Sequence, residues 1–146
     1  MLFPATTKLV AGSTDAEVNA RIRQETLRNV ASYQYASEQE ISVRIQALQK
    51  EWDTERLLEV SSASLTAIFT YLGFRRGKYW FLLPGIVSGF LLQHALWGWC
   101  PPLPIIRRLG VRTAAEIHHE ISALKVLRGD FTITREPAEA LMESTT

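Results

Sequence analysis

The chain has 146 residues and a formal net charge of +1, and 47% of its residues are hydrophobic. Because basic and acidic residues are interleaved along the chain, the sequence offers no basic surface for a nucleic acid. The single cysteine, Cys100, excludes an internal disulfide and leaves a free thiol or a bond between chains. The first residues lack a basic start followed by a long apolar core, so we expect no cleaved signal peptide.

Residues 1–54 are predicted to form a polar helical region. A first helix is expected to begin at Ser13 or Thr14. Its loose apolar stripe consists of Val18, Ile22, Leu27 and Val30. A second helix is expected to begin at Ser37, because Ser37 and Glu40 have the spacing of a capping box. Its tighter stripe consists of Ile41, Ile45, Leu48 and Trp52. We expect this face to pack against the first helix, with another subunit or the membrane surface as the alternatives.

The apolar residues are concentrated in residues 55–104, where the helix at about 79–99 is the clearest membrane candidate. No Asp, Glu, Lys or Arg occurs between Tyr79 and Trp99. A helix of that length reaches roughly 30 Å, which matches the hydrocarbon core of a bilayer. Tryptophan and tyrosine side chains lie at both ends, as in the aromatic belts of membrane helices. The sequence therefore predicts a spanning helix, and a buried helix of a soluble bundle is the competing interpretation.

The helix at about 57–74 is a weaker membrane candidate. It contains Glu59 and five hydroxyl residues, which are Ser61, Ser62, Ser64, Thr66 and Thr70. Such hydroxyls can bond to carbonyls of the preceding turn, so they are compatible with burial in a membrane. No Gly or Pro separates this helix from the second polar helix, so the two could be continuous. The connection at 73–78 is short, and we therefore expect the two apolar helices to lie antiparallel as a hairpin.

The expected fold class is all-α, with an antiparallel two-helix transmembrane hairpin flanked by amphipathic polar helices. Gly85 and Gly89 form a GxxxG step in the second apolar helix, and such small residues permit close helix contact. This stripe could pack against Ala63 and Ala67 within the hairpin, or it could join two chains. The sequence leaves both uses open.

The orientation of the hairpin is predicted from basic residues near the helix ends, because these are retained on the cytoplasmic side. The terminal side carries Arg44, Lys50, Arg56, Arg107, Arg108 and Arg112, and the turn carries Arg75, Arg76 and Lys78. This excess on the terminal side predicts that both termini are cytoplasmic.

Residues 105–131 are predicted to form a C-terminal polar helix. Thr113 and Glu116 again have capping-box spacing, and Gly129 is placed as a helix stop. The expected buried face consists of Ile117, Ile121 and Leu124, followed by Leu127 or Arg128. Residues 132–146 are expected to be a flexible tail.

Between Trp52 and Phe131 the chain resembles the uncharacterised bacterial family of YgaP-like transmembrane domains. The resemblance lies in the runs WDTERLLE, LLP, FLLQHALWGWCPPLPIIRRLGVRTAAEIHHE and ALKVLRGDF, and its most specific part is Gln93 to Pro104. It implies a two-helix hairpin of the inner membrane, sometimes fused to a rhodanese sulfurtransferase domain and able to form a homodimer. The N-terminal region here is too short and too helical for a rhodanese domain. Sulfur-transfer activity is therefore not implied for this short form.

A few residues are candidates for chemistry. Cys100 is expected at the membrane edge, either as a small interfacial residue or as a functional thiol whose thiolate Arg107 and Arg108 favour. Glu59 and His94 are expected near the same interface, where they could form a hydrogen-bonded pair.

The remaining polar residues give little evidence of a site. Gln93 is expected to bond across helices. The adjacent His118 and His119, beside Glu116 and Glu120, point about 100° apart on a helix and make a poor metal site. We therefore expect no metal and no cofactor.

Two functions remain compatible with the sequence. The first is a non-enzymatic scaffold or anchor in the inner membrane, whose partners are the lipid bilayer, a second copy of the chain or an unidentified protein. The second is a sulfur-handling or redox membrane component that uses Cys100. Because the sequence contains no P-loop, nucleophile elbow or paired catalytic carboxylates, we expect the protein not to be an enzyme.

Overall fold

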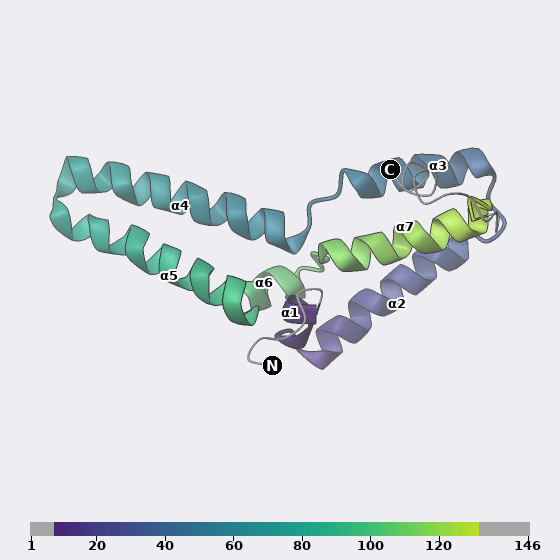
Figure 1. Cartoon of the computed structure of the whole chain (residues 1–146), viewed down its shortest axis with the longest axis horizontal. Coiled ribbons are helices and arrows are strands. Elements are labelled where there is room, and N and C mark those ends of the chain that lie inside the picture. Colours follow the sequence, from purple (N-terminus) through teal and green to yellow (C-terminus); the bar gives the residue numbers. More distant parts are fainter. Residues whose placement is uncertain (1–7, 132–146) are drawn as a thin grey trace, which may run out of the picture.

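The computed structural model describes residues 8–131, and its regular structure is helical throughout that range (Figure 1). The elements in chain order are α1 (Leu9–Gly12), α2 (Ala16–Ser32), α3 (Glu38–Gln49), α4 (Thr54–Arg76), the 3-10 helix η2 (Lys78–Phe81), α5 (Leu82–Trp97), α6 (Leu103–Arg108) and α7 (Ala114–Arg128). The all-α fold class is therefore confirmed. The tail expected at 132–146 lies outside the described residues.

One half of the molecule is a bundle of α2, α3 and α7, in which α7 lies between the other two (Figure 1). Its core combines one apolar stripe from α3 with one from α7, namely Ile41, Ile45, Leu48, Ile117, Ile121 and Leu124. Both stripes are confirmed up to Leu48 and Leu124. Trp52, which lies beyond the end of α3, is exposed, and so is Leu127, while Arg128 is half-buried. The expected partner of α3 was wrong, because α3 packs on α7. The stripe of α2 is too loose for that role: Ile22 is buried, but Leu27 is exposed.

The ends of the bundle helices follow from local capping. Both predicted capping boxes form, at Ser37 with Glu40 and at Thr113 with Glu116. Gly129 ends α7 with a φ of 87°, a left-handed conformation that glycine adopts without strain. The predicted start of α2 at Ser13 or Thr14 was wrong, because the Asp15 carboxylate is the cap and accepts a hydrogen bond from the Glu17 amide.

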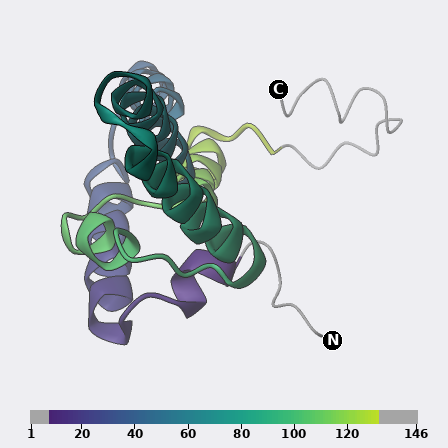
Figure 2. The ribbon, with the colours of Figure 1, turned by 90° about the vertical axis from the view of Figure 1, so that its left-hand side faces the viewer.

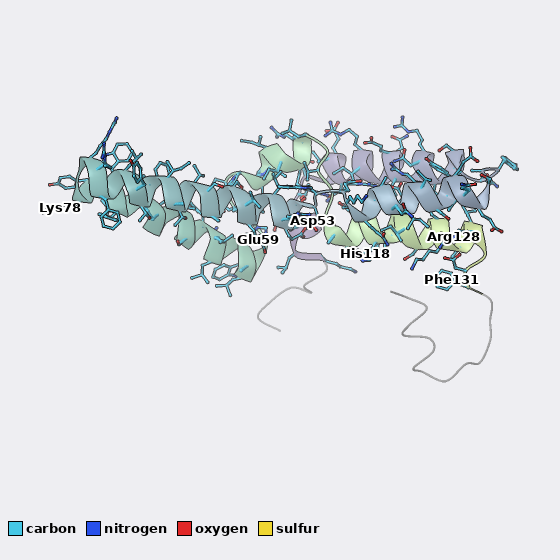
Figure 3. All side chains as sticks on the ribbon, turned by 90° about the horizontal axis from the view of Figure 1, so that it is seen from above. Asp53, Glu59, Lys78, His118, Arg128 and Phe131 are labelled. Atoms are coloured by element: carbon cyan, nitrogen blue, oxygen red, sulfur yellow. The ribbon has the colours of Figure 1, made fainter. Side chains whose placement is uncertain are left out.

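The other half of the molecule consists of α4 and α5, which run side by side in opposite directions (Figures 1 and 3). Helix α4 does not continue α3, because the Asp53 carboxylate caps a new helix by accepting a hydrogen bond from the Arg56 amide. It is also longer at both ends than the predicted 57–74. Helix α5 ends at Trp97, because Gly98 adopts a φ of 75°.

The turn between α4 and α5 requires two glycines. Gly77 has a φ of 126°, in the region that favours glycine. Gly73 lies against the ring of Phe81, and a Cβ added there would come within 2.8 Å of that ring. Phe81 also packs edge-to-face on Phe74, with ring centroids 5.2 Å apart. This packing holds the two helices together at their far end.

Helices α1 and α6 lie where the α4–α5 pair meets the bundle (Figures 1 and 2). They supply a second core, which consists of Val10, Leu58, Cys100, Leu103 and Ile106. The polar helix predicted within 105–131 is α7, which begins at its Thr113 cap, and the short helix α6 before it was not predicted; Gly110, with a φ of 88°, turns the chain between α6 and α7. The segments before α4 and after α5 thus assemble at the same end of the pair.

Candidate functional site at the junction of the helix pair and the bundle

Helices α4 and α5 expose an unusual amount of apolar surface. Two stretches are long and apolar enough to cross a membrane: Glu38–Arg76, which contains α3 and α4, and Lys78–Trp97. None of the residues of α5 is buried. Phe90, Leu91 and Leu92 are consecutive and all exposed. Because successive helical residues point about 100° apart, this apolar surface covers more than half of the helix circumference. A surface of this kind marks contact with a membrane or another protein.

The polar groups of α4 are compatible with such a surface. The Ser61 hydroxyl donates to the Leu57 carbonyl over 2.6 Å, as the sequence predicted for these hydroxyls. At the near end of α4, the Arg56 guanidinium lies 4.6 Å from the ring centroid of Trp52. Figure 3 places Glu59 and Asp53 near this junction and Lys78 at the far end. The charged residues thus lie towards the two ends of α4.

Arg107 of α6 is completely buried and uses all five of its N–H donors. Its two terminal nitrogens each donate over 2.7 Å to one carboxylate oxygen of Glu116 in α7. They also donate over 2.9 Å to the Val111 carbonyl and to Asn19 Oδ1 in α2. The Nε atom donates to Thr14 Oγ1 over 3.2 Å. One side chain therefore ties α6 to α7, to α2 and to the segment before α2.

The pKa of Glu116 reflects this environment. Burial opposes ionisation of the carboxyl, but hydrogen bonds from Arg107 and from the backbone and side chain of Thr113 outweigh it. The pKa of Glu116 is therefore held below its ordinary value. The Glu116 carboxyl is thus ionised at neutral pH.

A second buried arginine, Arg112, joins α3, α4 and α7. Its guanidinium pairs with Glu51, two residues after the end of α3, with Nε 2.8 Å from Oε1. It also pairs with the fully buried Glu120 of α7. Glu120 also accepts from Arg44 Nη2 over 2.7 Å. The Arg112 carbonyl accepts from the amide of Thr54, the first residue of α4, over 2.8 Å. Burial opposes the charge of Arg112, but the two carboxylates outweigh it and raise its pKa. Helix α4 is thus fixed to the bundle at its first residue.

Cys100 lies in the core under α6 and is 3% exposed. Burial raises the pKa of this thiol, and the Leu103 amide hydrogen bond opposes that rise only in part. Arg107, which the sequence placed near the thiol to favour the thiolate, is fully engaged with Glu116 and its other acceptors. The sequence-based prediction of a functional thiol at Cys100 therefore gains no support from its surroundings.

Glu59 and His94 line the same pocket of about 360 Å³, together with Glu55, Val10 and Leu91 among others. The prediction that they lie near one another agrees with this placement. Within the described part of the chain, however, His94 Nδ1 is buried and has no hydrogen-bond partner. The direct Glu59–His94 hydrogen bond stays a prediction, and Glu55 is a second carboxylate at the same place.

Gly85 and Gly89 face open space. A Cβ added to either glycine would meet no atom within 4 Å. Of the two uses that the sequence left open, close packing within the α4–α5 pair is therefore not the one observed. The contact between chains stays a prediction. Gly98, in contrast, faces α1, and a Cβ added there would lie 2.5 Å from the Leu9 carbonyl oxygen.

The remaining predicted polar residues lie apart from this junction or have other partners. Gln93 is half-buried in α5, and His118 and His119 are exposed on α7. Their neighbours Glu116 and Glu120 are bound by arginines. Among residues 8–131, no group of three His, Cys, Asp or Glu side chains is placed to hold a metal ion.

Comparisons with protein-family models, curated proteins and solved structures found no match to the chain. The resemblance to YgaP-like transmembrane domains therefore stays a prediction from the sequence. The two arginine networks were not predicted from the sequence. Arg112–Glu51 and Arg44–Glu120 join residues 61 and 76 positions apart, and Arg107–Glu116 and Arg112–Glu120, nine and eight positions apart, depend on the turn before α7. A weak signal was available in RRLGVRTAAE, where basic residues directly precede a capped helix with acidic residues.

Proposed function

We propose that this protein is a small integral protein of the inner membrane in which α4 and α5 cross the bilayer as an antiparallel hairpin. The observation that carries the proposal is the exposed apolar surface of α5, which buries none of its residues. In water, exposed apolar area costs about 25 cal/mol per Å² relative to burial. The bilayer removes this cost without requiring a large protein partner.

The bundle of α2, α3 and α7 lies on the cytoplasmic side in this proposal. Both chain segments that flank the hairpin fold together at one end of it (Figure 1). The opposite orientation would require the whole charged N-terminal segment to be carried across the membrane. Cytoplasmic termini require only the short turn, with Arg75, Arg76 and Lys78, to cross.

The activity that fits this arrangement best is that of a non-enzymatic scaffold or anchor. Arg112 fixes the bundle to the start of α4, and Arg107 fixes it to α6, which follows the end of α5, so the bundle is held at a set position above the bilayer. Such a protein displays the bundle to a protein partner or joins a second copy through the Gly85–Gly89 face. The thiol alternative ranks below it, because Cys100 is buried and its pKa is raised.

The substitution Ile86→Arg tests the membrane proposal, because Ile86 is exposed on α5, one turn in from its start at Leu82. In a soluble protein an exposed Ile→Arg change is close to neutral, but in a bilayer it costs about 2.5–3.5 kcal/mol. We expect wild-type protein to resist extraction by high salt and alkaline carbonate, and Ile86→Arg to lower the inserted fraction. Leu27→Arg, on exposed α2, is the matched control and should have no effect.

Release of the wild-type chain by high salt alone would contradict insertion.

The substitution Cys100→Ser distinguishes a scaffold or anchor from a thiol-based component. A scaffold should keep its assembly and its cellular phenotype, whereas a thiol device would lose its function.

A further inference from the structure

A pocket of about 430 Å³ opens between α4, α5 and α6, at the end of the helix pair that adjoins the bundle. Its walls are almost wholly apolar and include Leu58, Leu65, Phe90, Leu91, Pro102 and Ile105. The pocket also contains Ser61, whose hydroxyl is already bonded to the Leu57 carbonyl. A ligand for this pocket must therefore present an apolar chain.

Helix α6 has one buried apolar face and one exposed apolar face. Leu103 and Ile106 face the core with Arg107, whereas Ile105 and Leu109 are 64% and 77% exposed. Ile105 forms part of the pocket wall. Helix α6 follows α5 after only five residues, so a membrane-spanning α5 places α6 at the bilayer surface. A short amphipathic helix at that level inserts its exposed apolar face among the lipid chains.

Two exposed arginines, Arg108 and Arg21, lie at the end of α6. Arg108 is exposed and lies one turn after Ile105, so the two side chains share a face. Arg21 of α2 is exposed, and its Nη2 donates to the Arg108 carbonyl over 2.6 Å. Within residues 8–131, neither arginine forms an ion pair with a carboxylate. Arg108 thus places positive charge one helical turn from the pocket residue Ile105, and Arg21 adds a second guanidinium bonded to the Arg108 backbone.

We propose that the pocket between α4, α5 and α6 holds an acyl chain of a bilayer phospholipid whose anionic headgroup binds Arg108 and Arg21. Cationic groups at a membrane surface select anionic lipids, and the pocket is continuous with the apolar surface of α4 and α5. The inference rests on the proposed membrane insertion and adds a specific lipid site to it. This site would seat the bundle at the bilayer surface.

The proposal is tested by photo-crosslinking in bilayer nanodiscs that contain the full chain. The probes are phosphatidylglycerol and phosphatidylcholine, each with a diazirine in one acyl chain, at trace level in unlabelled phosphatidylcholine. We expect phosphatidylglycerol to label pocket residues such as Leu65 and Ile105 more strongly than phosphatidylcholine does. Equal labelling by both lipids would overturn the proposal.

Two pairs of variants locate the site. Ser62→Trp places a large ring in the pocket and should abolish pocket labelling, whereas Ser64→Trp, an exposed residue outside the pocket lining, should not. Arg108→Gln should lower phosphatidylglycerol labelling roughly fivefold, the factor for one cationic contact at an anionic surface. Arg28→Gln, exposed on α2, is its control. Because Arg108 is exposed, this arm stays informative if Ser62→Trp fails to fold.

Unchanged pocket labelling in Ser62→Trp or in Arg108→Gln would overturn the lipid site, even if the protein remains inserted. Loss of insertion itself is measured separately by the carbonate extraction of wild-type protein. The lipid site and the membrane proposal therefore fail in different experiments.

Discussion

The guanidinium of Arg107 and the carboxylate of Glu116 form two hydrogen bonds of 2.7 Å each and join α6 to α7. Arg107 is fully buried, and the Glu116 side chain is 23% exposed. Removing one partner of a buried ion pair leaves the other charge uncompensated, which costs about 3–5 kcal/mol. The pair therefore contributes to holding the bundle at the end of the α4–α5 pair.

Glu116→Gln should lower the free energy of unfolding of the detergent-solubilised protein. The decrease should lie towards the lower end of the range of about 3–5 kcal/mol, because Glu116 is partly exposed. Thermal or denaturant unfolding measures this change. Glu25→Gln, an exposed residue of α2, is the control and should change stability by about 0.5 kcal/mol or less.

The same pair gives a signed pH dependence. The folded pKa of Glu116 is below the ordinary value, so its contribution is complete above the unfolded pKa of about 4.3 and is lost as pH falls through the folded pKa. The wild-type melting temperature should therefore fall on acidification below about pH 4.3, and Glu116→Gln should weaken this dependence. Identical acid profiles for the two proteins would show that the pair does not contribute.

Gly98→Ala should destabilise the protein more than Gly129→Ala does. Both glycines have a positive φ, which costs other residues about 1–3 kcal/mol. Only at Gly98 would the new Cβ also lie 2.5 Å from the Leu9 carbonyl oxygen, whereas at Gly129 it would meet nothing within 4 Å. The difference between the two melting temperatures measures the contact of α1 with the end of α5. Equal losses would mean that α1 does not pack there.

Gly85→Ile combined with Gly89→Ile should leave the monomer folded and inserted, because both positions face open space. If two chains associate through this face, chemical crosslinking of the dimer should be lost. Gly73→Ile is the contrasting variant, because a Cβ there would lie 2.8 Å from the Phe81 ring and should disrupt the turn. A dimer that persists in the double variant would exclude the glycine face as the interface.

His94→Leu should raise the melting temperature, because His94 Nδ1 is buried without a hydrogen-bond partner in the described part of the chain. An unsatisfied buried polar group costs about 1–3 kcal/mol, which leucine avoids. His119→Leu, exposed on α7, is the control. A clear loss of stability in His94→Leu would instead indicate the hydrogen bond with Glu59 that the sequence predicts.

The elements that depend on local spacing could be predicted from the sequence. The capping boxes at Ser37 and Thr113, the stripe of α7 and the helix stop at Gly129 all follow from residues within a few positions of one another. The break between α3 and α4 was missed because α3 ends at Gln49 and Asp53 caps α4 with no Gly or Pro between the two helices.

Features that depend on tertiary contacts could not be read from the sequence. The pairing of α3 with α7 joins segments more than 60 residues apart, and periodicity alone does not name the partner of an apolar stripe. Arg107 and Arg112 were counted as free charges that orient the hairpin, although both are used in ion pairs with carboxylates. The glycines at 85 and 89 matched a helix-packing motif, whereas Gly73, without a motif, makes the close contact.

The most direct measurement for the central claim is cysteine labelling with a membrane-impermeant maleimide, in a Cys100→Ser background. Lys78→Cys lies at the turn between α4 and α5, and Arg28→Cys lies on exposed α2. In intact spheroplasts we expect Lys78→Cys to be labelled and Arg28→Cys to be labelled only after lysis. Labelling of both cysteines from the same side of the membrane would contradict a hairpin that spans the bilayer.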